Sequence, residues 1–260
     1  MDTLVIGGSP DLRDAVIRRL HDEGRSSRTL GASSLVSCHG ETVAEHGCPW
    51  QVQDPEGLVD QLEDIDQVIH LLSPPPPSLP PAVRLFNWFT RGTYALLVAA
   101  REAGVREFVV VSSLDIFRCH PDQYCISESW APAPPTEDVP LGQYLAEETY
   151  RVFSRCNDMS VAVLRLGSVV LEEDVAGQTF NPLWIDARDV AVAVSRARAA
   201  PRHPFEEKMP PVRRKWRVFH LSLPVENPRF SATRATGLSL QFQPEHLFRT
   251  GAPADREGDA

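Results

Sequence analysis

The stretch FTRGTYALLVAAREAGVREFVVVSS, residues 89–113, decides the fold. Its apolar residues recur at helical spacing, at Leu96, Leu97, Ala100 and Ala103. This spacing predicts an amphipathic helix over 92–103. Gly104 ends that helix, because glycine adopts the left-handed conformation of a helix end without steric cost.

The second half of the stretch reads as a strand. Residues 108–111 are Phe-Val-Val-Val, with no polar residue to mark an exposed face. Such a run is typical of a strand that is buried on both faces of a parallel sheet. Ser112 and Ser113 then stand at the carboxyl end of the strand, where open α/β sheets bind their ligands.

The N-terminus repeats this alternation of strand and helix. An apolar strand, Leu4–Ile6, leads directly into Gly7-Gly8-Ser9-Pro10, and an amphipathic helix follows up to Gly24. Strand, glycine turn and helix in this order form the context that a dinucleotide-binding turn requires.

Together these segments resemble the extended short-chain dehydrogenase/reductase superfamily, in its NAD-dependent epimerase/dehydratase group. The resemblance rests on Gly92-Thr93, on Ala103-Gly104-Val105 and on Ser112-Ser113, and it extends from about Leu4 to about Leu223. It implies an α/β fold: a Rossmann-like, doubly wound, mostly parallel sheet with helices on both faces. The short segment between the strand at 161–166 and Trp184 implies only a small C-terminal appendage on the substrate side.

We therefore expect a single NAD(P)-binding domain over residues 1–250, followed by a disordered tail at 251–260. The predicted strands lie near 3–6, 27–30, 50–52, 67–72, 107–111, 161–166 and 217–221. His70 falls inside one of these apolar strands, so we expect it to be a packed core residue.

The cofactor positions depart from the family pattern. Pro10 and Arg13 stand where the second and third glycines of the turn belong, and proline also lacks an amide that could bind phosphate. Gly31 and Ala32 replace the residue that reads the adenosine ribose. The resemblance assigns cofactor binding to Gly7, Gly8, Ser9, Gln51, Leu72 and Ser73. We expect binding of NAD or NADP to be weak or absent.

The catalytic positions depart further. The family uses a Tyr-x-x-x-Lys pair, and Leu141 and Leu145 occupy these two positions in the predicted helix at 141–156. The only lysines of the chain are Lys208 and Lys215, so no Tyr-x-x-x-Lys exists in any register. Leucine can neither transfer a proton nor donate a hydrogen bond.

Three hypotheses follow for function. The first is a non-catalytic or regulatory homologue, a pseudoenzyme. The second is an active NAD(P)-dependent oxidoreductase or epimerase acting on a nucleotide sugar or similar small molecule with other acid/base groups. The third is a purely structural interaction module. Ser113 and Tyr144 are the candidate catalytic residues, and Tyr124 and His120 are further acid/base candidates.

The composition of the chain indicates which classes of binding partner to expect. The chain has 26 Lys and Arg against 35 Asp and Glu, a net charge of −9, which excludes nucleic acid as the expected partner. No apolar run has membrane-spanning length, so we expect a cytoplasmic protein whose partner is a small molecule, a nucleotide or a second copy. Its 5 cysteines are odd in number and are expected to be reduced. Cys38-His39 and His46-Gly47-Cys48 match no zinc spacing, so we expect no metal.

Overall fold

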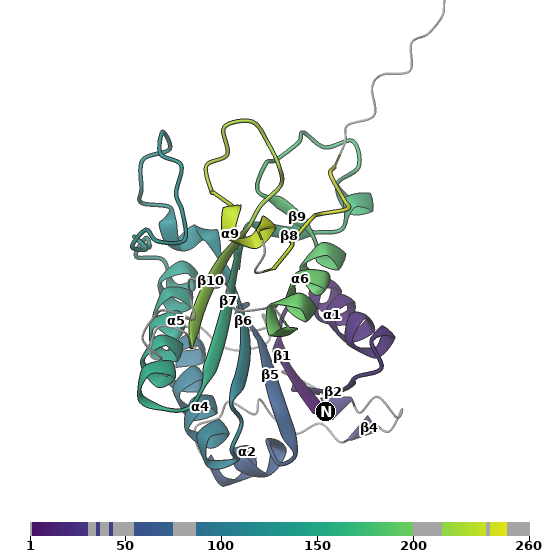
Figure 1. Cartoon of the computed structure of the whole chain (residues 1–260), viewed down its shortest axis with the longest axis vertical. Coiled ribbons are helices and arrows are strands. Elements are labelled where there is room, and N and C mark those ends of the chain that lie inside the picture. The colour runs from purple at the N-terminus through teal and green to yellow at the C-terminus, as the bar shows by residue number, and fades with distance from the viewer. Residues whose placement is uncertain are drawn as a thin grey trace, which may run out of the picture.

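The computed structural model describes residues 2–30, 35–36, 42–43, 55–74, 87–199, 215–237 and 240–248. A six-stranded sheet forms its centre (Figure 1). In spatial order the strands are β10 (Trp216–Leu221), β7 (Ser160–Leu166), β6 (Glu107–Ser113), β5 (Ile65–Leu71), β1 (Asp2–Gly7) and β2 (Ser26–Leu30). All pairings within this sheet are parallel.

Strand β6 lies inside the sheet between β5 and β7, and residues 108–111 are fully buried. The prediction of a doubly buried strand is therefore confirmed. The other predicted strands of the sheet are also present, with ends shifted by one or two residues. The strand predicted at 50–52 and the tail predicted at 251–260 lie outside the described residues.

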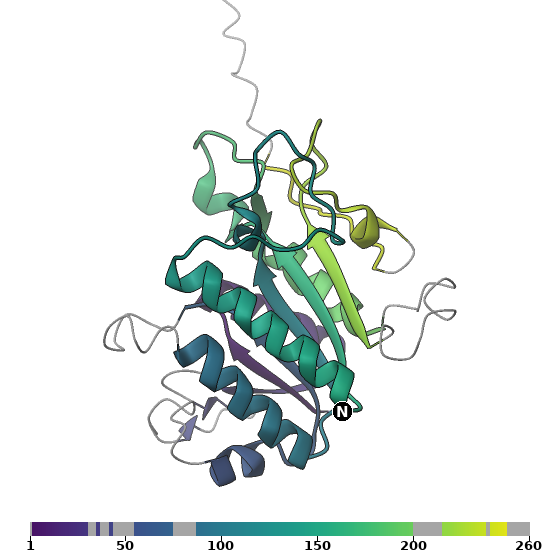
Figure 2. The ribbon, with the colours of Figure 1, turned by 90° about the vertical axis from the view of Figure 1, so that its left-hand side faces the viewer.

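Helices cover both faces of the sheet. On one face lie α1 (Pro10–Asp22) and α6 (Ala187–Ala199); on the other lie α2 (Pro55–Gln61), α4 (Thr93–Glu102) and α5 (Asp138–Cys156) (Figure 2). Successive residues of β6 alternate between the two cores: Val109 packs toward α1 and α6, and Val110 toward α4 and α5. This alternation is the period of two that a strand imposes.

The ends of α4 confirm the sequence prediction. A π-helical turn, η1 (Trp88–Gly92), leads into it, and Gly104 follows it with φ of 81°. The helix α5 packs closely on η1, because a Cβ on Gly142 would lie only 2.5 Å from the Phe89 ring. Glycine at 142 therefore lets α5 approach its neighbour.

Short elements gather at the carboxyl end of the sheet (Figure 1). They are η2 (Leu114–Phe117), the parallel pair β8 (Ser168–Val170) and β9 (Trp184–Asp186), η3 (Glu172–Val175) and α9 (Thr233–Thr236). The sequence did not predict β8 and β9. A separate antiparallel pair, β3 (Leu35–Val36) and β4 (Thr42–Val43), completes the described elements. Among the described helices, none is long and apolar enough to cross a membrane.

Candidate functional site

The candidate site lies where the chain reverses its direction across the sheet. From β1 the chain passes to β2 on one side, and it later returns to β5 on the other. Open α/β sheets bind ligands at such a reversal, at the carboxyl ends of the strands. Gly7 and Gly8 lie at the end of β1, and Leu72 and Ser73 follow β5, so the fold brings these predicted residues together.

Both glycines of the turn are required by the backbone. Gly7 has φ of 76° and Gly8 has φ of 84°, conformations that L-residues rarely adopt. A Cβ on Gly7 would lie 2.4 Å from the carbonyl oxygen of Leu71, and one on Gly8 would lie 2.5 Å from the Leu71 side chain. The turn therefore packs directly on the end of β5.

Ser73 closes this contact. Its hydroxyl accepts a hydrogen bond of 2.8 Å from the amide of Gly8, and its carbonyl accepts one of 3.2 Å from the Trp88 indole. The amide of Gly8 is thus paired within the protein. Two residues that the resemblance assigned to the cofactor bind each other.

The start of α1 offers little to a phosphate. Ser9 caps the helix, and its hydroxyl accepts a hydrogen bond of 3.4 Å from the amide of Leu12. Pro10 occupies the first helical position and has no amide. The exposed Asp11 carboxylate lies in the first turn, where it already complements the positive end of the helix dipole.

The two serines at the end of β6 have different roles. Ser113 caps η2, and its hydroxyl accepts a hydrogen bond of 3.0 Å from the amide of Asp115. The hydroxyl of Ser112 is buried and has no hydrogen-bond partner among the described residues. The candidate catalytic Ser113 thus caps η2, and its role in catalysis stays a prediction. The neighbouring hydroxyl of Ser112 is unpaired within the part of the chain that the structure describes.

Helix α5 presents polar side chains to the sheet. Gln143 and Glu147 are buried, whereas Leu141 and Leu145 are only half-buried. The Gln143 amide donates a hydrogen bond of 2.7 Å to the carbonyl of Leu72, beside the glycine turn. Gln143 is thus the residue by which α5 contacts the candidate cofactor site.

Glu147 makes an ion pair with Arg165 of β7. The closest contact joins Arg165 Nη2 and Glu147 Oε2 at 2.6 Å, and both side chains are buried. Phe117 covers the guanidinium, with the ring centre 5.1 Å from Arg165 Cζ. The carboxylate that α5 presents to the strands, that of Glu147, is therefore balanced by the charge of Arg165.

The remaining acid/base candidates lie in one aromatic region. Tyr144 packs against a small apolar cluster that includes Leu114 and Phe117. Trp130 packs against the same cluster, and it contacts the exposed Tyr124 and His120, the latter with ring centres 5.3 Å apart. The fold therefore gathers these three candidates around the cluster that follows β6.

His70 is a core residue, as predicted. Its Nδ1 lies 2.8 Å from the hydroxyl of Tyr150 on α5, and both side chains are buried. Burial lowers the pKa of His70 to about 3 and raises that of Tyr150. The pair is neutral and joins α5 to β5.

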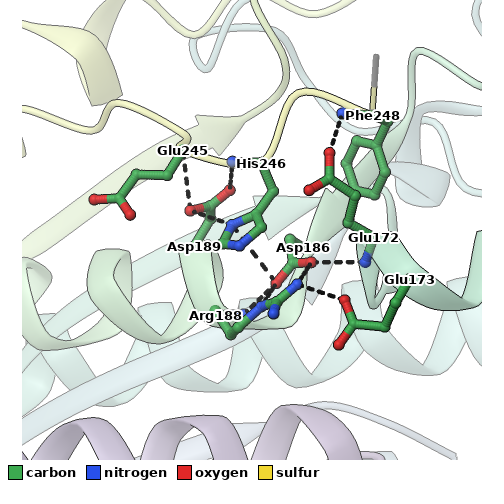
Figure 3. Close-up of polar contacts among 8 residues, drawn as sticks. All are labelled: Glu172, Glu173, Asp186, Arg188, Asp189, Glu245, His246 and Phe248. Atoms are coloured by element: carbon green, nitrogen blue, oxygen red, sulfur yellow. Dashed lines mark hydrogen bonds and ion pairs between the residues drawn. The ribbon is translucent and has the colours of Figure 1, made fainter. Parts of the chain in front are cut away.

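Carboxylates hold the C-terminal segment beside β9 and α6 (Figure 3). Asp189 accepts hydrogen bonds of 3.0 Å from the amides of both Glu245 and His246, and Glu172 accepts one of 2.9 Å from Phe248. Burial opposes ionisation of Asp186, but hydrogen bonds from Arg188 outweigh it and lower the pKa of this carboxyl group.

Comparisons with known proteins identify the family of the chain. The family model "NAD dependent epimerase/dehydratase family" matches residues 3–183. The chain belongs to the NAD-dependent epimerase/dehydratase family. The expected superfamily and fold are thereby confirmed, and the family is one of NAD-dependent proteins. A comparison with curated proteins found no match.

Several solved structures share the fold. MoeE5 in complex with UDP-glucuronic acid and NAD has a TM-score of 0.71 at 17% identity, covering 95% of this chain and 96% of that one. Glucuronic acid dehydrogenase from Chromohalobacter salexigens has a TM-score of 0.72 at 19% identity, covering 94% and 84%. UDP-N-acetylglucosamine 4-epimerase from Bacillus cereus has 0.67 at 15%, covering 95% of each.

The sequence analysis did not identify four buried polar residues on α5 and on the last two strands of the sheet. These are Gln143, Glu147, Arg165 and His220. Two signals were available: Arg165 interrupts an apolar strand, and His220 interrupts another. Gln51, the remaining predicted cofactor residue, lies outside the described residues.

Proposed function

We propose that this chain is a non-catalytic, regulatory member of its family that binds a dinucleotide weakly or not at all. The observation that carries the proposal is the glycine turn: the amide of Gly8 is paired with Ser73, and Pro10 has no amide to give. Backbone amides at a helix start are what binds pyrophosphate in such folds. The described residues therefore fit a pyrophosphate poorly.

The face of α5 supports the same proposal. Proton transfer needs a titratable group near the reacting atoms, with a suitable pKa. The buried positions of α5 instead hold Gln143, tied to Leu72, and Glu147, tied to Arg165. No lysine precedes Lys208 in the chain.

Calorimetric titration with NAD and with NADP tests the proposal. We expect dissociation constants well above the micromolar range for both. Binding in the submicromolar range would contradict weak affinity. The protein is then mixed with NAD and either UDP-glucose or UDP-glucuronic acid. The absorbance of reduced nicotinamide should not rise, because we expect no hydride transfer.

The alternative is an active oxidoreductase or epimerase on a nucleotide sugar. It is supported by the solved structures, whose names include NAD and UDP-sugars, and by Tyr144, which packs against the apolar cluster that includes Leu114 just after β6. Turnover by the wild-type protein that is lost in Tyr144→Phe would establish this alternative. Turnover that survives in Tyr144→Phe would reject Tyr144 as its acid/base group. We further propose the cytoplasm as its location.

A further inference from the structure

Two exposed cysteines flank a turn in the loop that follows η2. Cys119 and Cys125 are free thiols at the surface. Between them, the amide of Tyr124 donates a hydrogen bond of 3.3 Å to the carbonyl of Pro121. Such a turn brings its first and fourth residues within about 7 Å of each other and reverses the chain. The two cysteines therefore lie on the two limbs that enter and leave the turn.

Arg229 binds both limbs of this loop. Its carbonyl accepts a hydrogen bond of 2.7 Å from the amide of Ile126 on the outgoing limb. Its guanidinium donates one of 2.9 Å to the carbonyl of His120 on the incoming limb. The guanidinium also pairs with Asp122 inside the turn. One residue thus ties together the chain next to both cysteines.

The aromatic rings of the loop face Trp130. The ring centre of Trp130 lies 5.3 Å from that of His120 and 5.6 Å from that of Tyr124. His120 follows Cys119 in sequence and Tyr124 precedes Cys125, and both cysteines are exposed. The two rings thus turn toward Trp130 and the two thiols toward solvent. Both thiols are therefore open to a small reagent in solution.

We propose that Cys119 and Cys125 are a redox-sensitive pair that forms a reversible disulfide across the turn. A disulfide requires two Cα atoms within about 7 Å of each other. A short turn whose limbs are both tied to Arg229 and Trp130 favours this approach.

The oxidant is a low-molecular-weight disulfide such as oxidised glutathione. The thiolate of one cysteine attacks a sulfur of this disulfide, forms a mixed disulfide and releases one glutathione thiolate. The thiolate of the other cysteine then attacks the protein sulfur of the mixed disulfide and releases the second glutathione. The pair loses its two thiol protons and two electrons, and the oxidant becomes two thiols.

The disulfide stiffens the loop that carries His120 and Tyr124. An exposed disulfide is readily reduced, and disulfides of this kind in reducing compartments are transient and redox-sensing. Because the two limbs are already held together, ring closure orders few further bonds of the chain. Ring closure should therefore compete well with the attachment of a second glutathione.

The experiment treats the full-length protein with oxidised glutathione, blocks the remaining thiols with iodoacetamide and maps tryptic peptides by mass spectrometry. Both cysteines lie in the tryptic peptide 119–151, which should lose the mass of two hydrogen atoms. Further cleavage after Tyr124 with chymotrypsin should leave two fragments joined until dithiothreitol is added. The loop disulfide should be half-formed at about tenfold less oxidised glutathione than the mixed disulfide of Cys156, the exposed cysteine at the end of α5.

Matched variants separate ring closure from simple exposure of a thiol. Cys119→Ser and Cys125→Ser should each leave one loop thiol that carries glutathione, as expected for Cys156. Arg229→Gln loses the guanidinium contacts with the loop and should raise the oxidant requirement severalfold. An unchanged requirement in Arg229→Gln overturns the proposal, because the limbs are then not held by this residue. Glutathione on both loop cysteines of the wild type, or a disulfide from either of them to another cysteine, also overturns it.

Discussion

Glu147 of α5 and Arg165 of β7 form a buried ion pair at the carboxyl end of the sheet. Arg165 Nη2 lies 2.6 Å from Glu147 Oε2, and the two side chains are 6% and 1% exposed, respectively. Nε of Arg165 donates to the same oxygen at 3.0 Å. The pair fixes α5, the helix of Leu141 and Leu145, to an inner strand of the sheet next to its β10 edge.

Removing one member of this pair should be costly. Glu147→Leu leaves the Arg165 charge buried without compensation, and we expect a loss of about 3–5 kcal/mol in the free energy of unfolding. Combining it with Arg165→Met removes both charges and should restore most of that loss. Urea denaturation of the two single variants and the double variant measures this. Equal stability of Glu147→Leu and wild type would show that the pair is not essential to the fold.

The two members of the ion pair show which features of the fold could be predicted from the sequence and which could not. The strand at 108–111 was predictable because its four apolar residues require burial on both faces, and the sheet follows from several such runs. The partner of Arg165 was not predictable. Glu147 lies in a helix with charged residues on more than one side, and only the docking of α5 on the sheet shows which side is buried.

The candidate site was predictable only in part. The glycines at 7 and 8 indicated a turn, because the left-handed backbone needs them. The hydroxyl of Ser73 on the Gly8 amide was not foreseen, since 65 residues separate the two in sequence. The pair β8 and β9 was also missed, because three-residue strands are too short to show an alternation.

Burial of His70 should make stability depend on pH. The pKa of His70 is lowered from 6.5 to about 3 in the folded protein, so between these values the unfolded chain binds more protons. Stability should therefore fall as pH decreases through this window, by about 1.4 kcal/mol per pH unit from this residue. In His70→Gln the slope of unfolding free energy against pH should be smaller by that amount. The exposed His21→Gln serves as control, and identical slopes in wild type and His70→Gln would exclude a neutral buried His70.

Asp189 should hold the C-terminal segment in place. Its carboxylate accepts the amides of Glu245 and His246, and hydrogen bonds to a charged group are worth about 1.5–3 kcal/mol. In Asp189→Asn one of these bonds is lost, because the side-chain amide is itself a donor. Hydrogen exchange in the peptide that contains these amides, measured by mass spectrometry, should be roughly tenfold to a hundredfold faster at the amide that loses its bond. Glu173→Gln is the control, since the Glu173 side chain is 59% exposed and pairs only with Arg188 among the described residues. Equal exchange in the two variants would show that Asp189 does not hold the segment.

Repair of the turn should tighten dinucleotide binding. Pro10→Gly adds an amide at the start of α1, and Arg13→Gly removes a half-buried side chain from the third glycine position. One amide regained by a charged phosphate is worth about 1.5–3 kcal/mol, or roughly tenfold to a hundredfold in the dissociation constant for NAD. Ser73→Ala, which frees the amide of Gly8, should add to this effect. Pro224→Gly, in an exposed loop, controls for the added flexibility of glycine. Because each change acts on the pyrophosphate, ADP-ribose should gain as much affinity as NAD in the same calorimetric titration. No gain for either ligand would show that the turn does not limit binding and that the cause lies elsewhere in the site.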